Sequence, residues 1–312
     1  MFNGYAAGVY DQQGGGNDAP VGTLATASPD DVVVNFDAEG ESVSAQIALW
    51  APDGGGATIE FGNPETGGSS TFTDDQTYSA TAGKDSVTVY TDESTQAHVN
   101  SAQAKLSSGG ELLCTDCSFI RWGPWDAHLN YKEEGVKGST NVFAEGWWVT
   151  GDVIDQSDLP TDANATYAGT AIATVANNLS GDGWTTYVAK GDLDMDWDFN
   201  ARAGNLTISK FDQGLTPGGL TFSGRMTTPG ELAGKNQFGG PLSLTSQLPA
   251  NLSQLNELSG FATGSFVRGP HNFNAQGNFI PKSTPQGVIG NWNVNSANYK
   301  AGGIFAGSAV PR

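Results

Sequence analysis

Short runs in which polar and apolar residues alternate recur along the chain, and turns rich in glycine or proline separate them. Residues 42–49 alternate with the period of two that is typical of a half-buried strand. Residues 95–107 are the only reasonable candidate for a short helix in the first half of the chain. The pattern therefore predicts an all-β fold of antiparallel strands and tight turns. Further β runs in the first half are expected at residues 31–37, 58–61, 71–73 and 86–90.

The second half has a more regular pattern, in which turns such as Pro217-Gly218-Gly219 bound longer strands. An even number of regularly spaced strands favours an up-and-down barrel, because closure leaves no exposed sheet edge. Four leucines recur at helical spacing over residues 248–258, and we expect this turn to plug a barrel end or to pack on its wall. The eight strands are expected at residues 166–178, 184–199, 203–212, 220–228, 240–247, 259–269, 287–295 and 299–308.

An aromatic hairpin is expected just before this region, over residues 119–131 and 142–149. Trp147 and Trp148 are adjacent, so their side chains point to opposite faces of a strand. One of them is therefore expected to face outward or toward a surface between two units. For the tryptophan cluster, packing between the two units is favoured, and stacking on a carbohydrate or a partner is the alternative. The possible interaction surface consists of Trp125, Trp147, Trp148 and Tyr5.

The first eleven residues, MFNGYAAGVYD, look like an isolated strand, because a flexible loop with three glycines at positions 14–16 follows them. Such an arm could complete the sheet of a neighbouring molecule by strand addition. The arm therefore suggests a self-assembling subunit of an extracellular filament or sheath. We also expect the native chain to begin upstream of Met1, because the sequence is strand-like from its first residues.

The charge of the chain is distributed unevenly. Its net charge is −19, and the whole of this excess lies in residues 1–160, while residues 161–312 are neutral. We expect an acidic β-rich domain over residues 1–155 and a glycine-rich barrel domain over residues 165–312, with a linker at about residues 152–165. Nucleic acid and anionic lipid would be repelled by such a surface. Divalent cations, a basic partner or solubility alone are compatible with it.

Cys114 and Cys117 form a CxxC pair. A strand-like sequence follows the pair, whereas redox-active pairs usually open a helix. A zinc site would need two further ligands, for which His98 and His128 are the candidates, at no recognised spacing. A local disulfide is therefore favoured, and a metal site and free or redox-active thiols remain as alternatives.

Four aspartates alternate with apolar residues between Asp192 and Phe199. In a strand this pattern places the carboxylates on one face, about 6.5–7 Å apart. A solvent-exposed outer face of the barrel is the simplest interpretation. Calcium is a possible ligand if a loop adds oxygen atoms to two of the carboxylates, and paired catalytic carboxylates are a third possibility. The candidate metal ligands are Asp192, Asp194 and Asp196.

Sequence motifs of enzymes are missing from the chain. It contains no GxSxG, P-loop, dinucleotide-binding or HExxH motif, and we therefore predict a non-enzymatic protein. No run of 18 apolar residues is present, so no transmembrane helix is expected. The low content of charged residues, 15%, together with abundant glycine, favours an extracellular or cell-surface location.

Two blocks of sequence resemble known bacterial surface proteins. Residues 119–169 carry Trp-Gly-Pro-Trp, Trp-Val-Thr-Gly, Leu-Pro and Ala-Thr-Tyr-Ala-Gly in succession, which resembles the region after FecR-type domains in proteobacterial surface proteins. Residues 260–266, 287–292 and 301–308 resemble the closing strands of the transferrin-binding-protein-like barrel. This resemblance implies display outside the outer membrane and binding of iron-carrier proteins or haem. The family's usual Gly-Pro-x-Ala-x-Glu is Gly-Pro-His-Asn-Phe at residues 269–273, and no binding residue is carried over.

Together these observations predict a non-enzymatic bacterial cell-surface or secreted protein that serves binding or adhesion. A protein partner or self-association is expected, and the filament or sheath subunit is the alternative.

Overall fold

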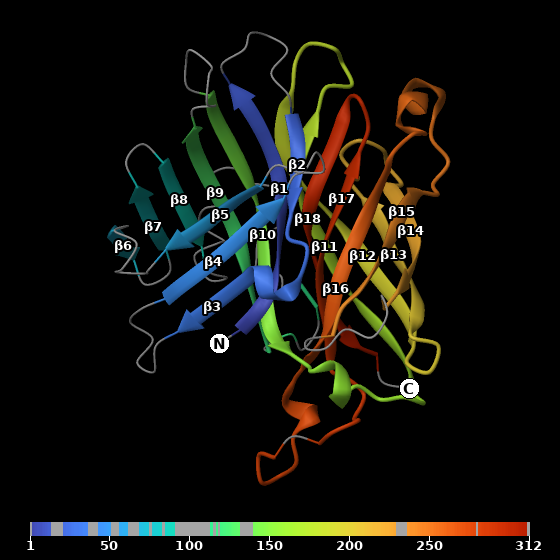
Figure 1. The fold of residues 1–312 in the computed structure, drawn as a ribbon. Helices are drawn as coiled ribbons and strands as arrows, with labels where there is room; N and C mark the ends of the chain where they lie inside the picture. The colour runs from blue at the N-terminus through green and yellow to red at the C-terminus, as the bar shows by residue number, and fades with distance from the viewer. Residues whose placement is uncertain are drawn as a thin grey trace.

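The computed structural model describes residues 2–13, 21–36, 43–50, 56–61, 69–74, 77–82, 85–90, 113–114, 117, 119–131, 140–228, 236–278 and 280–310. In these ranges the chain is almost entirely β-structure, with four short 3₁₀ turns, η1 to η4. Figure 1 shows an open sheet, in blue to green, beside a closed barrel that runs from green to red. The expected helix at residues 95–107 lies outside the described residues. No helix in the described ranges is both long and apolar enough to cross a bilayer.

Eight antiparallel strands close the barrel in sequence order. Each strand pairs with the next, and the last, β18, pairs with the first, β11, along the register from Tyr167↔Ala309 to Asn177↔Tyr299. This topology confirms the predicted all-β fold and the up-and-down barrel. The strands are β11 (Asn164–Asn177), β12 (Thr185–Asp198), β13 (Ala203–Phe211), β14 (Leu220–Thr227), β15 (Phe238–Leu244), β16 (Ser259–Arg268), β17 (Gly287–Asn295) and β18 (Tyr299–Ala309).

Alternate residues of these strands fill the barrel with aromatic and aliphatic side chains. On β12, for example, Leu193, Met195 and Trp197 are buried while the residues between them are exposed. Trp197 packs edge-on against Phe266 with ring centroids 5.2 Å apart, a favourable geometry for two aromatic rings. The expected leucine turn is η3 (Ala250–Leu255), and Leu255 and Leu258 are buried in the barrel core as predicted.

The open sheet is built around the central strands β1 (Phe2–Gln13) and β10 (Thr140–Val153). β9 (Ile120–Tyr131) pairs with β10 over twelve residue pairs, as the predicted aromatic hairpin requires. At its end β10 also pairs with β16 of the barrel through Asp152↔Arg268 and Val153↔Val267. The remaining strands are β2 (Val21–Ala25), β3 (Val32–Phe36), β4 (Val43–Trp50), β5 (Gly56–Phe61), β6 (Ser69–Asp74), β7 (Thr77–Ala82) and β8 (Asp85–Tyr90).

The expectation of a free N-terminal arm is wrong. β1 pairs with β10 on one edge and with β2 and β3 on the other, so its backbone is already used within the chain. Its middle, at Ala6 and Gly8, lies against β17 and β18 of the barrel. Tyr5 is fully buried, and its hydroxyl lies 2.7 Å from Ser265 Oγ on β16. A strand paired on both edges cannot be donated to a neighbouring molecule, so the arm does not support the filament or sheath subunit.

The four aromatic side chains expected to form an interaction surface do not form an exposed one. Trp147 and Trp148 are 1% and 3% exposed, and Trp125 and Tyr5 are equally buried. Trp147 belongs to a cluster that packs the open sheet on barrel residues such as Ile289 and Ile304. Both of the adjacent tryptophans are therefore covered, and neither faces outward. The two sheets are in contact through this cluster, while the predicted division into two domains stays a prediction.

Candidate functional site

A groove of about 560 Å³ lies where the open sheet meets the barrel wall. One side is the segment that follows β2, and the floor is the outer face of β15, β16 and β17. Its volume is within the range of about 300–1,000 Å³ that is common for small-ligand sites. The lining residues are Ala25, Thr26, Ala27, Thr227, Gln237, Phe238, Gly239, Gly240, Pro241, Phe261, Thr263, Asn291 and Asn293.

Asparagines on β17 build the floor of the groove. Asn291, Asn293 and Asn295 alternate with Trp292 and Val294, which point into the barrel core. The asparagine side chains therefore share the outer face of the strand. Asn295 donates from Nδ2 to Asn293 Oδ1 at 3.4 Å, so the side chains of this row also contact one another.

Asn291 joins the two walls of the groove. Its Nδ2 donates to Thr26 O and Thr26 Oγ1, each at 2.8 Å, and lies 3.2 Å from Ala6 O. The side chain is only 3% exposed. A buried amide that bonds to two segments about 270 residues away in the sequence fixes the segment after β2 against the barrel.

Three polar groups in the groove have bonding capacity that the described residues do not use. Asn291 Oδ1 and Asn293 Nδ2 have no hydrogen-bond partner there, although the other atom of each amide does. Thr263 is 7% exposed and lines the groove, and within the described ranges its hydroxyl has no partner either. Buried polar groups are normally paired, so groups left open toward a groove are available to a ligand.

Phe261 is the exposed aromatic residue of the groove. Its side chain is 48% exposed, the largest exposed fraction among the large apolar residues of the described chain. It stands opposite Pro241 on β15 and Asn293 on β17. A Cβ added to Gly239 would lie 3.1 Å from Phe261 Cε1, so the missing side chain at that glycine leaves room for the ring over β15. The ring is therefore supported from below and open toward the groove.

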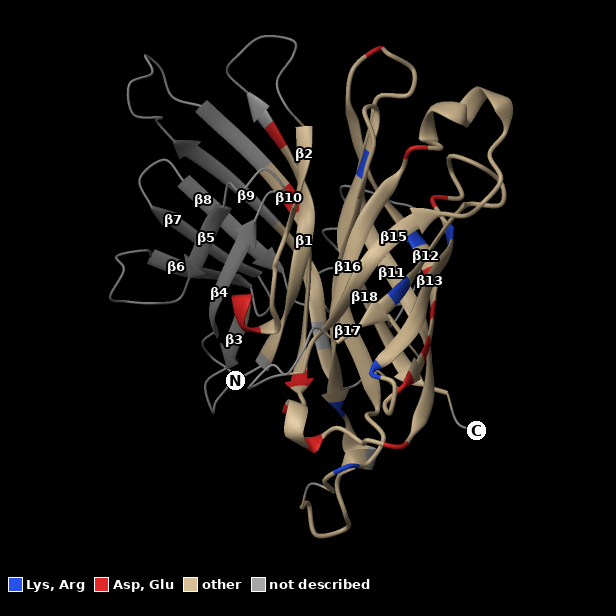
Figure 2. Cartoon of the chain, turned by 45° about the vertical axis from the view of Figure 1, so that its right-hand side comes forward, with Lys and Arg blue, Asp and Glu red and all other residues tan. Residues whose placement is uncertain are grey.

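The groove carries no charge among its described lining residues. β17 has no charged residue. The only charged residue of β16 is Arg268 at its end, and the Arg268 side chain forms salt bridges with Asp152 and Asp158. Figure 2 shows the charged residues of the barrel on other strands and at the ends, in red and blue. A ligand in the groove can therefore contact amides, hydroxyls and one aromatic face.

The aspartates predicted as metal ligands lie outside this groove. Asp192, Asp194 and Asp196 are exposed on the outer face of β12. Lys210 Nζ lies 2.7 Å from Asp192 Oδ2, and Thr166 donates to Asp196 Oδ1 at 2.8 Å. No three histidine, cysteine, aspartate or glutamate side chains gather in a metal-binding group within the described chain. Calcium binding by these aspartates stays a prediction.

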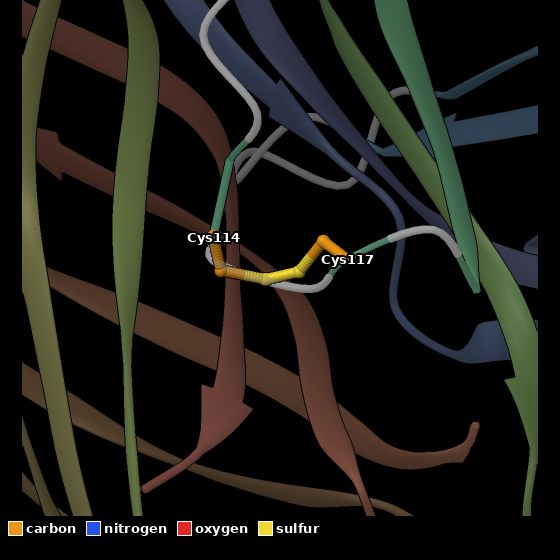
Figure 3. The surroundings of a disulfide bond; sticks show 2 residues. All are labelled: Cys114 and Cys117. Atoms are coloured by element: carbon orange, nitrogen blue, oxygen red, sulfur yellow. A yellow bond between two sulfur atoms is a disulfide. The ribbon is translucent and has the colours of Figure 1, made fainter. Parts of the chain in front are cut away.

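The two cysteines are joined by a disulfide in the structure, with their Cα atoms 5.4 Å apart (Figure 3). Cys114 and Cys117 are 5% and 3% exposed and belong to the cluster between the open sheet and the barrel. Of the two histidines considered as zinc ligands, His128 lies on β9 and His98 lies outside the described residues.

One polar cluster was not anticipated from the sequence. Tyr187 and Tyr299 both donate to Asp212 Oδ2, at 2.7 and 2.8 Å, at the end of the barrel where β11 leads to β12. Burial raises the pKa of Asp212, and the two tyrosine hydrogen bonds partly offset this shift. Burial and the nearby Asp212 carboxylate raise the pKa of both tyrosines. Tyr187 and Tyr299 lie 25 and 87 positions from Asp212 in the sequence, so no local motif could reveal this cluster.

Comparisons with known proteins find distantly similar solved structures but no family. No protein-family model matches the chain. No curated protein matches it in sequence. Among solved structures, it is similar to a double mutant of the vaccine antigen transferrin binding protein B from Haemophilus parasuis Hp5, with 14% identity and a TM-score of 0.41. That match covers 100% of this chain and 60% of the other, so this chain spans less than two thirds of the Haemophilus protein.

A second similar structure is intact Ap-TbpB with its N and C lobes, with 11% identity and a TM-score of 0.40, covering 99% of this chain and 77% of that one. The association with FecR-type domains stays a prediction. Identities and TM-scores of this size transfer no ligand to this chain.

Proposed function

We propose that this chain is a non-enzymatic binding protein of the bacterial cell surface or surrounding medium, and that the groove between the two sheets is its binding site. The observation that carries this proposal is the set of unused polar groups on Thr263, Asn291 and Asn293, placed around an exposed phenylalanine. Concave sites with a few convergent polar groups and an apolar surface are typical of ligand binding.

The barrel supplies the rigidity that such a site needs. The floor residues lie on strands that are paired on both sides, and their inward neighbours are packed in the core. The bond network of Asn291 fixes the facing wall. A ligand would therefore meet a preformed surface and would not need to order it, which favours affinity.

The proposed location rests on composition and on the cysteines. A buried disulfide suits an oxidising compartment, such as the periplasm or the exterior of the cell. The sparse charge and abundant glycine suit the same environment.

Ligand-observed saturation-transfer NMR tests the proposal. The probes are neutral oligosaccharides, acidic oligosaccharides and short uncharged peptides, each offered separately to the wild-type protein. Asn293→Trp should fill the groove and remove the signal of any probe that binds there. The matched control is Asn205→Trp, because Asn205 is exposed on the outer face of β13, away from the groove.

The proposal expects at least one probe class whose signal disappears with Asn293→Trp and persists with Asn205→Trp. It is wrong if no probe class behaves in this way. Thermal melts of both variants should match the wild type within a few degrees, which shows that the loss of signal does not come from unfolding.

A further inference from the structure

We infer that the groove takes a neutral sugar, with the carbon face of one sugar ring stacked on Phe261 and its hydroxyl groups bonded to Thr263, Asn291 and Asn293. This inference rests on the proposed function and adds the chemical class of the ligand. It follows from the types of polar group present, the aromatic face, and the strand pairing of the floor.

The unused polar groups match the hydroxyl groups of a sugar. Each sugar hydroxyl both donates and accepts a hydrogen bond, and the groove offers an acceptor at Asn291 Oδ1, a donor at Asn293 Nδ2 and both functions at the Thr263 hydroxyl. These atoms lie on adjacent strands, since Thr263 stands opposite Asn291 in the register. They therefore face one ligand from one surface.

Because the described lining residues carry no charge, the groove favours neutral ligands over ionic ones. A carboxylate, phosphate or ammonium group would lose its hydration on entering the groove and would find no opposite charge in return. A hydroxylated ligand replaces its water contacts with amide and hydroxyl contacts, which are nearly equivalent. Acidic saccharides should therefore bind more weakly than neutral ones.

Phe261 supplies the apolar half of the site. Its exposed fraction of 48% is unusual for a phenylalanine in a strand of this barrel, since the other phenylalanines on β15, β16 and β18 are buried. The carbon-bound hydrogens on one face of a sugar ring carry partial positive charge, and they pack well on the negative face of an aromatic ring. Stacking of a neutral sugar ring would bury the Phe261 side chain and bring no charge into the groove.

Strand pairing disfavours an extended peptide as the occupant. Peptides commonly add to a free sheet edge, where their backbone completes the hydrogen bonds. The floor strands β15, β16 and β17 are each paired on both sides and have no free edge. A peptide could use only side-chain contacts in the groove, whereas a sugar uses contacts of this kind for all of its recognition.

Isothermal titration with neutral oligosaccharides of glucose, galactose, mannose and N-acetylglucosamine tests the inference. At least one should bind the wild-type protein. Phe261→Ala should weaken that binding by about tenfold or more, because it removes the stacking surface, while Phe261→Trp should preserve or strengthen it. Thr263→Val keeps the shape of the side chain without the hydroxyl and should weaken binding by about 3–10-fold.

Phe273→Ala is the matched control, because Phe273 is another exposed phenylalanine, 38% exposed, outside the groove. It should leave the affinity unchanged. Neutral sugars that bind equally to wild type and Phe261→Ala overturn the inference.

The saturation-transfer NMR probes distinguish a failure of the sugar inference from a failure of the proposed binding site. If only acidic saccharides or only peptides lose their signal with Asn293→Trp, the groove is a binding site and the sugar class is wrong. If no probe is affected by Asn293→Trp, both the binding site and the sugar class are wrong.

Discussion

Substitution of Asn291 by alanine should weaken the junction between the open sheet and the barrel. Asn291 Nδ2 makes three contacts of 2.8–3.2 Å with Thr26 and Ala6, and the residue is 3% exposed. Asn291→Ala removes all three contacts. Ala6 O keeps the hydrogen bond from Thr26 N, at 2.9 Å, whereas Thr26 O has no other donor among the described residues.

The magnitude follows from these contacts. An amide with two hydrogens makes about two hydrogen bonds, each worth roughly 0.5–1.5 kcal/mol, and a carbonyl left buried and unpaired costs roughly 1–3 kcal/mol more. The free energy of unfolding should therefore fall by about 2–6 kcal/mol. At roughly 2–4 °C per kcal/mol, the midpoint of thermal unfolding should fall by about 4–24 °C.

Urea unfolding and thermal melts measure this loss. Asn293→Ala is the matched control, because Asn293 lies on the same face of β17, is only partly buried, and makes a single hydrogen bond within the described residues, which it accepts from Asn295 at 3.4 Å. It should cost less than about 1 kcal/mol. The reasoning is refuted if Asn291→Ala unfolds within about 0.5 kcal/mol of the wild type, or if the control costs as much.

Three further predictions follow from the described contacts. Deleting residues 2–12 removes the central strand of the open sheet and should abolish the cooperative thermal transition; a folded, monomeric deletion variant on size-exclusion chromatography would show that β1 is dispensable. A Cβ at Gly302 would clash with the carbonyl oxygen of Gly8, so Gly302→Ala should lower the free energy of unfolding in urea by about 2 kcal/mol or more. Gly218 has open space around it, so the control Gly218→Ala should change this free energy by less than about 1 kcal/mol. Burial raises the pKa of Asp212, so the folded state holds this proton more tightly than the unfolded chain, and the resulting stability is present below about pH 4 and is lost as the pH rises through the folded-state pKa. The stability of the wild type relative to Asp212→Asn should therefore fall as the pH rises from about 3.5 through the folded-state pKa in a series of urea titrations, and a constant or rising difference would contradict the buried carboxyl.

Much of the barrel could be predicted from the sequence, because its information is local. On β12, alternation from Asp192 to Phe199 assigns each side chain to the core or to solvent without reference to any other strand. Turn residues such as Gly181, with a φ of +80°, mark where a strand must end. Sequential strands in an up-and-down barrel pair with their neighbours, so order along the chain gives order in the sheet.

The first half carried a weaker signal, and two strands were missed there. β2 (Val21–Ala25) and β7 (Thr77–Ala82) are short and lie next to glycines or acidic residues, which made them look like loops. The N-terminal strand was found, but its partners were not, because β10 begins more than 120 residues after it. Pairing at such a distance leaves no trace in local periodicity.

The strand-forming segments, the apolar face of each strand and the division of charge along the chain are all visible in the sequence. The burial of Tyr5 and Trp147, and the contact of Thr26 with Asn291 across the groove, are visible only in the folded chain. Strand formation and alternation depend on neighbouring residues, whereas burial of a face and the lining of a groove depend on which distant strands cover it. The groove exists because five segments from residues 25 to 293 converge on one side of the barrel.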